Sequence, residues 1–253
     1  MVSEHDELAA YFEQWYVDMS GASLKDEIEQ RHLGLPADLL STSLLGWDGI
    51  AEVAAALELP AGGVLVDLAC GRGGYGLELA ARAGARVIGI DFATAALAVA
   101  RELAAARGAD AEFRRGDLVA TGLEDGVADG VVVVDAIQFP ADPAAAYAEV
   151  HRILRPGGRV VLTCWEPVDR SDPEVPARLR SVDLAAGLHG AGFVGVRVIE
   201  RPDWRAAERA MWTEAAALDP GGDAALQSFH DEGVRAVQLF DRLRRVLGTA
   251  VRR

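Results

Sequence analysis

Short apolar runs alternate with alanine-rich stretches of helical spacing through the middle of the chain. Six runs have the length of buried strands: 64–68, 86–90, 111–115, 130–134, 160–165 and 194–199. Four stretches between or after them favour helices: 74–83, 93–107, 143–154 and 176–189. Continuous apolar strands that alternate with helices are typical of a parallel sheet covered on both faces. The pattern therefore predicts an α/β fold with a doubly wound, mostly parallel sheet.

The two ends of the chain follow a helical pattern instead. One face of the first stretch is apolar and aromatic, with Leu8, Tyr11, Phe12, Trp15, Tyr16 and Met19. A second short helix is expected through Ile28, and a third has Asp48 as its N-cap and stops at Pro60. Residues 204–243 are helical again, with 221–243 as one full helix, and 245–251 is expected to be a seventh strand. We therefore expect a helical cap over 1–62 and a sheet domain over 63–253, with 204–243 as a helical lid inserted before the last strand.

Composition narrows the class of protein. The chain has 253 residues, of which 51% are hydrophobic, enough for one sizeable core. Its net charge of −14 argues against a nucleic-acid partner or an anionic membrane surface. Two cysteines cannot form a disulfide framework, and neither a signal peptide nor an apolar run of membrane-spanning length is present. These features predict a cytoplasmic protein.

The negative charge is concentrated at the start of the chain. Residues 1–62 carry twelve acidic residues against Lys25 and Arg31, a net charge of −10. The favoured interpretation is a solvated outer face opposite the aromatic stripe. A sharper alternative is a weak bias toward neutral or cationic substrates.

A glycine-rich turn follows the first expected strand. Gly71, Gly73 and Gly76 satisfy the spacing G-x-G-x-x-G, which lets a ligand approach exposed backbone N–H groups. Asp91 ends the second strand 20 residues after Gly71, where an acid can bind ribose hydroxyls. A nicotinamide dinucleotide and another adenosine-containing cofactor both fit these residues.

Asp67 helps to decide which of these two cofactors the chain binds. A strand that binds a diphosphate normally stays apolar up to its glycines, because the diphosphate repels a carboxylate. An acid in that strand suits a cationic ligand without phosphate, and S-adenosylmethionine is such a ligand. The alternative is that Asp67 caps its own glycine turn.

At this point the chain resembles the class I S-adenosylmethionine-dependent methyltransferases over about residues 63–200. Asp67-Leu-Ala-Cys-Gly71-Arg-Gly73 is similar to the D-x-G-x-G-x-G loop of that family, with Ala69 in place of the first glycine. Three further motifs follow in register: Gly89-Ile-Asp91-Phe92, Arg115-Gly116-Asp117-Leu118 and Asp135-Ala-Ile-Gln138-Phe139. A Leu154-Arg-Pro-Gly157-Gly158 turn precedes the fifth strand. The resemblance implies a seven-stranded Rossmann-like methyltransferase fold.

The resemblance also implies which residues hold S-adenosyl-L-methionine. Asp91 would bind the ribose, Asp117 the adenine amino group, and Leu118 would pack on the adenine ring. The full implied set is Asp67, Ala69, Cys70, Gly71, Gly73, Asp91, Phe92, Gly116, Asp117, Leu118, Asp135, Ala136 and Gln138. Arg72 has two interpretations of equal weight, namely neutralising the cofactor carboxylate or lying on the helix surface.

Methyl transfer is an in-line displacement that requires mainly alignment and desolvation, and a base only where the nucleophile must lose a proton. His230, in the expected lid, is the histidine that could reach a substrate, although an ordinary surface position is the more favoured interpretation. Positions past strand ends or in the cap give the candidate substrate-binding residues Tyr11, Tyr16, Trp47, Gln138, Trp165 and Glu166. No metal site is expected.

The sequence therefore predicts a methyltransferase acting on a small, apolar or aromatic metabolite, at oxygen, nitrogen or carbon, of the kind found in secondary metabolism. One alternative binds S-adenosylmethionine but catalyses another reaction or senses the cofactor. A remote alternative is an NAD-linked reductase, although its short-chain form is excluded because Gly21 lies four residues before Lys25, the single lysine. The exposed aromatic cap makes a homodimer reasonable.

Overall fold

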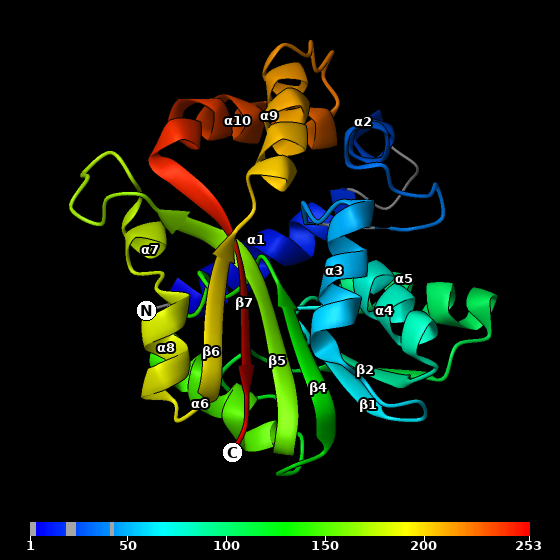
Figure 1. The fold of residues 1–253 in the computed structure, drawn as a ribbon. Coiled ribbons are helices and arrows are strands. Elements are labelled where there is room, and N and C mark those ends of the chain that lie inside the picture. Colours follow the sequence, from blue (N-terminus) through cyan, green and yellow to red (C-terminus); the bar gives the residue numbers. More distant parts are fainter. Residues whose placement is uncertain (1–3, 19–23, 41–42) are drawn as a thin grey trace.

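A seven-stranded sheet forms the centre of the computed structural model, which describes residues 4–18, 24–40 and 43–253 (Figure 1). The strands lie in the order β3-β2-β1-β4-β5-β7-β6. Their bounds are β1 Val64–Leu68, β2 Arg86–Asp91, β3 Ala111–Arg115, β4 Ala128–Val134, β5 Leu154–Pro167, β6 Val194–Glu200 and β7 Leu243–Val251. This order and the flanking helices confirm the predicted doubly wound methyltransferase fold.

Strand direction follows the expected scheme. The pairings from β3 to β5 are all parallel, whereas β7 runs antiparallel between β5 and β6. The central strands are buried on both faces, with Val131, Val132 and Val133 all at 0% exposure. Burial on both faces explains why β4 contains an uninterrupted run of valines.

Helices cover both faces of the sheet. One face packs against α3 Trp47–Leu57, α4 Gly74–Ala83 and α5 Thr94–Arg107, and the other against α6 Pro143–Ile153 and α8 Leu184–Gly190. Two separate apolar clusters result, one on each face of the sheet. Leu65 belongs to the first cluster and Val66 to the second, as the alternation of side chains along a strand requires.

A second group of helices lies beyond the carboxyl ends of the parallel strands, with α9 and α10 at the top of Figure 1 and α1 below them. It comprises α1 Glu4–Asp18, α2 Leu24–Leu33, α9 Pro202–Ala216 and α10 Ala224–Leu239, and the one-turn helix α7 Ala177–Arg180 lies beside them. In a doubly wound sheet, ligands bind at this edge. The N-terminal segment and the segment before β7 therefore meet at the functional end of the sheet.

Several predicted elements differ in detail. The expected helix 176–189 is two helices, because Asp183 leaves the helical conformation and accepts a hydrogen bond from the Ala186 backbone N–H to cap α8. Gly46, rather than Asp48, is the N-cap of α3, and α2 continues past Ile28 to Leu33.

The lid also differs from its expected form. It is two helices that pack against each other, α9 and α10, separated by the turn around Gly221 and Gly222, and α10 ends at Leu239. A short 3₁₀ turn, Phe240–Arg242, leads into β7. Met19, predicted to share the aromatic stripe of α1, lies outside the described residues. No helix in the described part of the chain is long and apolar enough to cross a membrane.

Candidate functional site

The glycine loop between β1 and α4 has a backbone that only small residues adopt easily. Gly71 and Gly73 have φ values of 51° and 80°, and Ala69 has a φ of 56°. An L-residue in this left-handed region costs about 1–2 kcal/mol. The methyltransferase motif has glycine where this chain has Ala69, so the substitution keeps the loop conformation at the cost of some strain.

Asp91 holds the loop in place from the end of β2. Its Oδ2 accepts a hydrogen bond of 2.8 Å from the Gly71 N–H, and its Oδ1 accepts one of 2.9 Å from the Ala93 N–H. Burial raises the pKa of this carboxyl above its ordinary value. Asp91 therefore joins the glycine loop to the start of α5 while also facing the pocket described below.

Asp67 lies beneath the same loop and is 3% exposed. A Cβ atom at Gly76 would lie 2.6 Å from Asp67 Oδ2, so only glycine lets α4 pass this close to the carboxylate. Burial, reinforced by the nearby Asp91 carboxylate, raises the pKa of Asp67 to about 8. The carboxyl is consequently poised to respond to a positive charge brought beside it.

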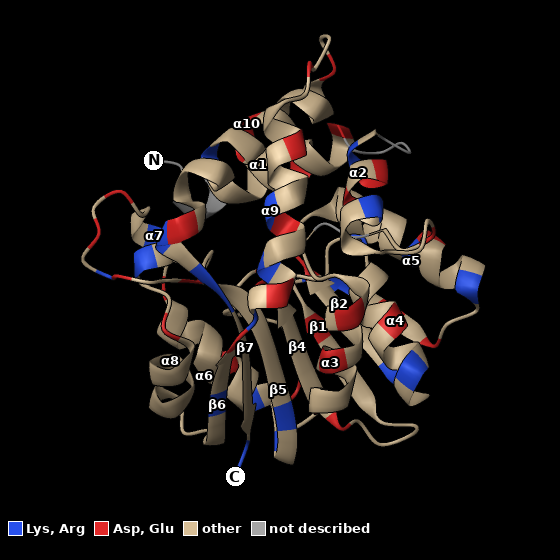
Figure 2. Cartoon of the chain, turned by 45° about the horizontal axis from the view of Figure 1, so that its top comes forward, with Lys and Arg blue, Asp and Glu red and all other residues tan. Residues whose placement is uncertain are grey.

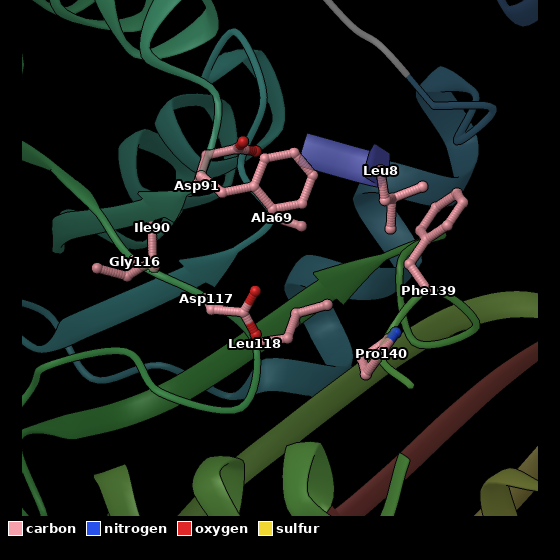
Figure 3. A pocket seen from close by; sticks show the side chains of 10 residues that line it. Leu8, Ala69, Ile90, Asp91, Gly116, Asp117, Leu118, Phe139 and Pro140 are labelled. Carbon is pink, nitrogen blue, oxygen red and sulfur yellow. The ribbon is translucent and has the colours of Figure 1, made fainter. Parts of the chain in front are cut away.

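A pocket opens at the carboxyl ends of β1, β2 and β4, with a volume of about 350 Å³ including its solvent-open part. We call it the strand-end pocket. Asp91, Asp117 and Leu118 lie on one side, with Leu8 and Phe139 across from them (Figure 3). The remaining lining residues are Ala69, Ile90, Phe92, Gly116 and Pro140. Carboxylates for hydroxyl and amino groups thus converge with apolar surfaces for a flat ring, which is what an adenosine group requires.

Helix α1 covers this pocket. The ring of Phe12 lies 5.9 Å from that of Phe92 and 5.3 Å from that of Phe139, measured between centroids. Glu13 accepts hydrogen bonds from the Thr94 and Ala95 N–H groups, at 2.6 and 3.1 Å, and so caps α5, whose own N-cap residue has no capping side chain. The aromatic stripe therefore closes the cofactor side of the molecule and is attached to α5 by a capping carboxylate.

Helix α2 is tied to the glycine loop by a buried ion pair. Arg72 Nη2 lies 2.6 Å from Asp26 Oδ1, and the two residues are 4% and 7% exposed. The expectation that Arg72 lies on the helix surface is therefore wrong, and its guanidinium is already engaged by the cap.

Acidic residues of the cap are not all solvated, contrary to the favoured interpretation of the N-terminal charge. Asp26 and Glu29 are buried, and Glu29 accepts a 2.5 Å hydrogen bond from the buried Lys25 ammonium. Both signs of charge occur along α2 and α9 in Figure 2. Part of the cap's charge is therefore structural.

Asp135, at the end of β4, is engaged elsewhere than in the strand-end pocket. Its carboxylate accepts hydrogen bonds from Arg245, from the Thr163 hydroxyl at 2.8 Å and from the Leu44 N–H at 3.1 Å. Arg245 also donates to Glu208 at 2.8 Å, and both of these residues are fully buried. One buried guanidinium therefore joins the ends of β4 and β7 to α9.

The predicted cofactor residues divide into two groups. Six line the strand-end pocket: Ala69, Asp91, Phe92, Gly116, Asp117 and Leu118. The others form the loop beneath it or the end of β4: Asp67, Cys70, Gly71, Gly73, Asp135, Ala136 and Gln138. Sequence reasoning did not assign Leu8, Ile90, Phe139 or Pro140 to the pocket, although Leu8 and Phe139 lay in the stripe and motif already noted.

None of the predicted substrate residues, Gln138 included, lines this pocket. Tyr16 is 9% exposed and packs against Ala93 and Ala96 of α5, while Trp47 lies under the Arg82 guanidinium, 4.4 Å from its ring. Tyr11 is 55% exposed at the edge of Phe12.

The two predicted residues at the end of β5 point to opposite sides of the sheet. Trp165 packs against Phe240, whereas Glu166 accepts hydrogen bonds from the Leu184 N–H and from Arg244. Because side chains alternate along a strand, Glu166 faces α8 rather than the strand-end pocket.

His230 does not line the pocket either. Its Nδ1 pairs with the carboxylate of the neighbouring Asp231 at 3.0 Å on the outer side of α10. Among the described residues, no cluster of histidine, cysteine or acidic side chains could hold a metal ion.

Comparisons with known proteins agree with this geometry. A family model described as a methyltransferase domain matches residues 66–162. The chain is 32% identical over 182 residues to the demethylmenaquinone methyltransferase of Thermus thermophilus, which covers 70% of this chain and 82% of that protein. It is also 35% identical over 123 residues to the 2-phytyl-1,4-naphtoquinone methyltransferase of Thermosynechococcus vestitus, which covers 48% of this chain and about half, 52%, of that protein.

A solved structure shares the fold. The phosphoethanolamine N-methyltransferase 2 of Haemonchus contortus, solved with phosphomonomethylethanolamine and S-adenosylhomocysteine, superposes with a TM-score of 0.71 at 21% identity over 84% of this chain and 54% of that chain. The pocket and these relatives together define the class: the chain belongs to the S-adenosylmethionine-dependent methyltransferases, and its cofactor is S-adenosyl-L-methionine. Like its relatives, it is an enzyme that methylates small molecules.

Proposed function

We propose that this enzyme transfers a methyl group from S-adenosylmethionine to a small, largely apolar aromatic acceptor. The observation that supports the proposal most is the strand-end pocket, where Asp91 and Asp117 meet the apolar surfaces of Phe92 and Leu118. These four residues would hold the adenosine group, with the ribose hydroxyls on Asp91 and the adenine ring against Leu118.

The glycine loop would hold the methionine end. Gly71 and Gly73 give it a left-handed backbone, and the Asp67 carboxyl beneath it suits a cationic neighbour. The bound cofactor supplies an activated methyl group, so the chain's own contribution is alignment and exclusion of water. Orientation of this kind can be worth about 7–11 kcal/mol of the barrier. Phe12 and Leu8 of α1 would exclude water from the site.

The acceptor class rests on the aromatic character of the cap and on the relatives. Tyr11, Phe12 and Phe139 present ring faces and edges next to the cofactor side. The Thermus relative is named as a demethylmenaquinone methyltransferase. A reduced demethylnaphthoquinone with a short prenyl tail is therefore the first acceptor to test.

Two measurements test the proposal. Calorimetry should show binding of S-adenosylmethionine and S-adenosylhomocysteine but not of NAD. Transfer of a radiolabelled methyl group should then be measured to a panel that contains the naphthoquinol, simple phenols, aromatic amines and short apolar alcohols. We expect turnover of an aromatic member. Binding of S-adenosylmethionine without transfer to any member would contradict the proposal and favour a non-methyl-transfer reaction of the same fold.

The wider setting of the enzyme follows from charge and topology. We propose that residues 1–62 act as a cap over a cofactor domain formed by 63–253, that nucleic acid is not a partner because the net charge is −14, and that the enzyme works in the cytoplasm. We also propose a homodimer, because Tyr11 is an exposed aromatic residue on the cap. Sedimentation equilibrium tests the assembly, and a monomer at micromolar concentration would contradict it.

A further inference from the structure

A second cavity lies between α6 and α8, on the face of the sheet that these two helices cover. Its volume is about 770 Å³ including its solvent-open part, and we call it the interhelix groove. Phe139 lines the strand-end pocket, whereas Ile137, two residues earlier, lines the groove, and the two cavities share no lining residue. The groove is therefore separate from the pocket that would hold the cofactor.

Small residues on both helices leave this space open. Ala144 and Ala148 of α6 line it, and so do Ala186, Gly187 and Gly190 of α8. Residues four apart in a helix lie on the same face, so each helix turns a face of small side chains toward the groove. Walls of this kind leave room for a flat ring between the two helices.

Tyr147 of α6 brings a polar group to these walls. The residue is 4% exposed, and its ring packs directly on the backbone of α8, because a Cβ atom at Gly187 would lie 2.1 Å from its Cε2. Within the described residues, no group forms a hydrogen bond with the Tyr147 hydroxyl. A buried hydroxyl without a partner costs free energy, and such a group calls for an explanation such as a bound molecule.

The other polar side chains of the groove are already engaged. Asp183 accepts a hydrogen bond of 2.9 Å from the Ala186 N–H and pairs with Arg170 at 3.0 Å. The Ser181 hydroxyl donates to a backbone carbonyl of α7 at 2.9 Å. Burial raises the pKa of Tyr147, so its hydroxyl stays protonated and can donate as well as accept. The groove therefore offers one unpartnered polar group among apolar walls.

We propose that the interhelix groove is a second ligand site and that it binds a small phenol, with the ring between α6 and α8 and the hydroxyl bonded to that of Tyr147. Apolar walls that include Ile137, Pro143 and Val182 require an apolar body, and the one unpartnered hydroxyl requires one polar group. A charged ligand would find no free counter-charge there, because Asp183 is paired. The site goes beyond the proposed function and does not depend on which acceptor is methylated.

The test compares p-cresol with toluene, which has the same ring and methyl group but no hydroxyl. Equilibrium dialysis measures both affinities in the presence of saturating S-adenosylhomocysteine. The proteins are the wild type, Tyr147→Phe, the groove-filling variant Ala148→Leu and the matched control Ala105→Leu, an exposed position of α5 on the opposite face of the sheet. Calorimetry with S-adenosylmethionine should give the same affinity for all four, which establishes that each variant is folded.

We expect the wild type to bind p-cresol about 3- to 10-fold more tightly than toluene, the range that one neutral hydrogen bond typically gives. Tyr147→Phe should bind the two compounds alike, with the affinity that the wild type has for toluene. Ala148→Leu should bind both at least about tenfold more weakly, because its larger side chain takes the place of the ring. Ala105→Leu should match the wild type with both compounds.

Three results would overturn the inference. Absence of p-cresol binding to the wild type at millimolar concentration would refute the site. Binding of p-cresol that is unchanged in both Tyr147→Phe and Ala148→Leu would place the compound elsewhere on the enzyme. Weaker binding in Ala148→Leu alone would show that the groove takes apolar rings without the hydroxyl contact, which refutes the assignment of a phenol. None of these results bears on methyl transfer, so the proposed function is tested separately.

Discussion

The two halves of the site are built in different ways. The cofactor half takes most of its lining from the ends of β1 and β2 and from the segments just after β3 and β4, which are close in sequence to the strands that position them. The proposed acceptor half is formed by α1, α2, α9 and α10, which come from opposite ends of the chain and pack together beyond the strand ends. Short motifs at the strand ends are suited to a cofactor that stays the same from one enzyme to another. The acceptor surface depends instead on how helices that are distant in sequence pack together. This difference explains why one fold can serve many acceptors.

The largest effect is expected from a substitution that removes the buried ion pairs of Arg245, which join the two halves. Arg245→Met leaves the buried carboxylates of Asp135 and Glu208 without their shared cation, which should cost about 3–5 kcal/mol of unfolding free energy. Urea denaturation measures it. The control Arg242→Gln removes an exposed pair with Asp172 and should cost about 1 kcal/mol or less. Equal losses in the two variants would show that Arg245 does not hold the junction.

A smaller effect should be confined to the cofactor half. Asp91→Ala removes the proposed ribose ligand and the acceptor of the Gly71 and Ala93 N–H groups, so S-adenosylmethionine should bind at least about 100-fold more weakly, or roughly 2.8 kcal/mol. Calorimetry measures the affinity, with Asp231→Asn as the control that should be unchanged. Retained affinity in Asp91→Ala would refute the ribose role.

The smallest effect concerns the pH dependence of the unfolding free energy, to which one buried acid in each half contributes. The pKa of Asp67 and that of Glu208 are both raised to about 8, mainly by burial. A carboxyl whose pKa is raised by folding adds stability below its ordinary value and loses that contribution as the pH rises through 8. The fall in unfolding free energy between pH 4 and 8 should therefore be shallower in Asp67→Asn and in Glu208→Gln than in the wild type.

Cofactor binding separates these two acids. Saturating S-adenosylmethionine brings positive charge beside Asp67 and should shrink the difference between the wild type and Asp67→Asn. The difference between the wild type and Glu208→Gln should stay as it was. Unfolding curves with and without cofactor measure both, and an equal response of the two variants would contradict the division into halves.

Six of the predicted cofactor residues line the strand-end pocket, because the information that points to them is local. The glycine loop and the acids Asp91 and Asp117 belong to short motifs whose spacing matches the strand ends. Residues that reach the pocket from elsewhere, such as Leu8 of α1, carry no local signal. Asp135 was predicted to face the cofactor, but its partner Arg245 is 110 residues away, and no short-range pattern announces such a pair.

For the acceptor half, the sequence predicted which segments of the chain form helices but not which way their side chains face. Helical spacing placed a lid before β7, yet it could not show that α10 turns Phe229 into the core and His230 toward Asp231 on its outer side. That choice depends on how α10 packs against α9, α2 and α1, which is fixed by tertiary contacts. The substrate residues predicted from strand ends show the same limit, because Glu166 faces α8 where Trp165 faces Phe240.

The most direct test of the central claim is a crystal structure of the complex with S-adenosylhomocysteine. The account predicts density for the adenosine group in the strand-end pocket, with the ribose hydroxyls on Asp91, the adenine ring against Leu118 and its amino group on Asp117. The homocysteine end should lie over Gly71 and Gly73, with its sulfur on the side of Phe139. Density for the ligand at any other place, or an adenosine group that does not contact Asp91 and Asp117, would contradict it.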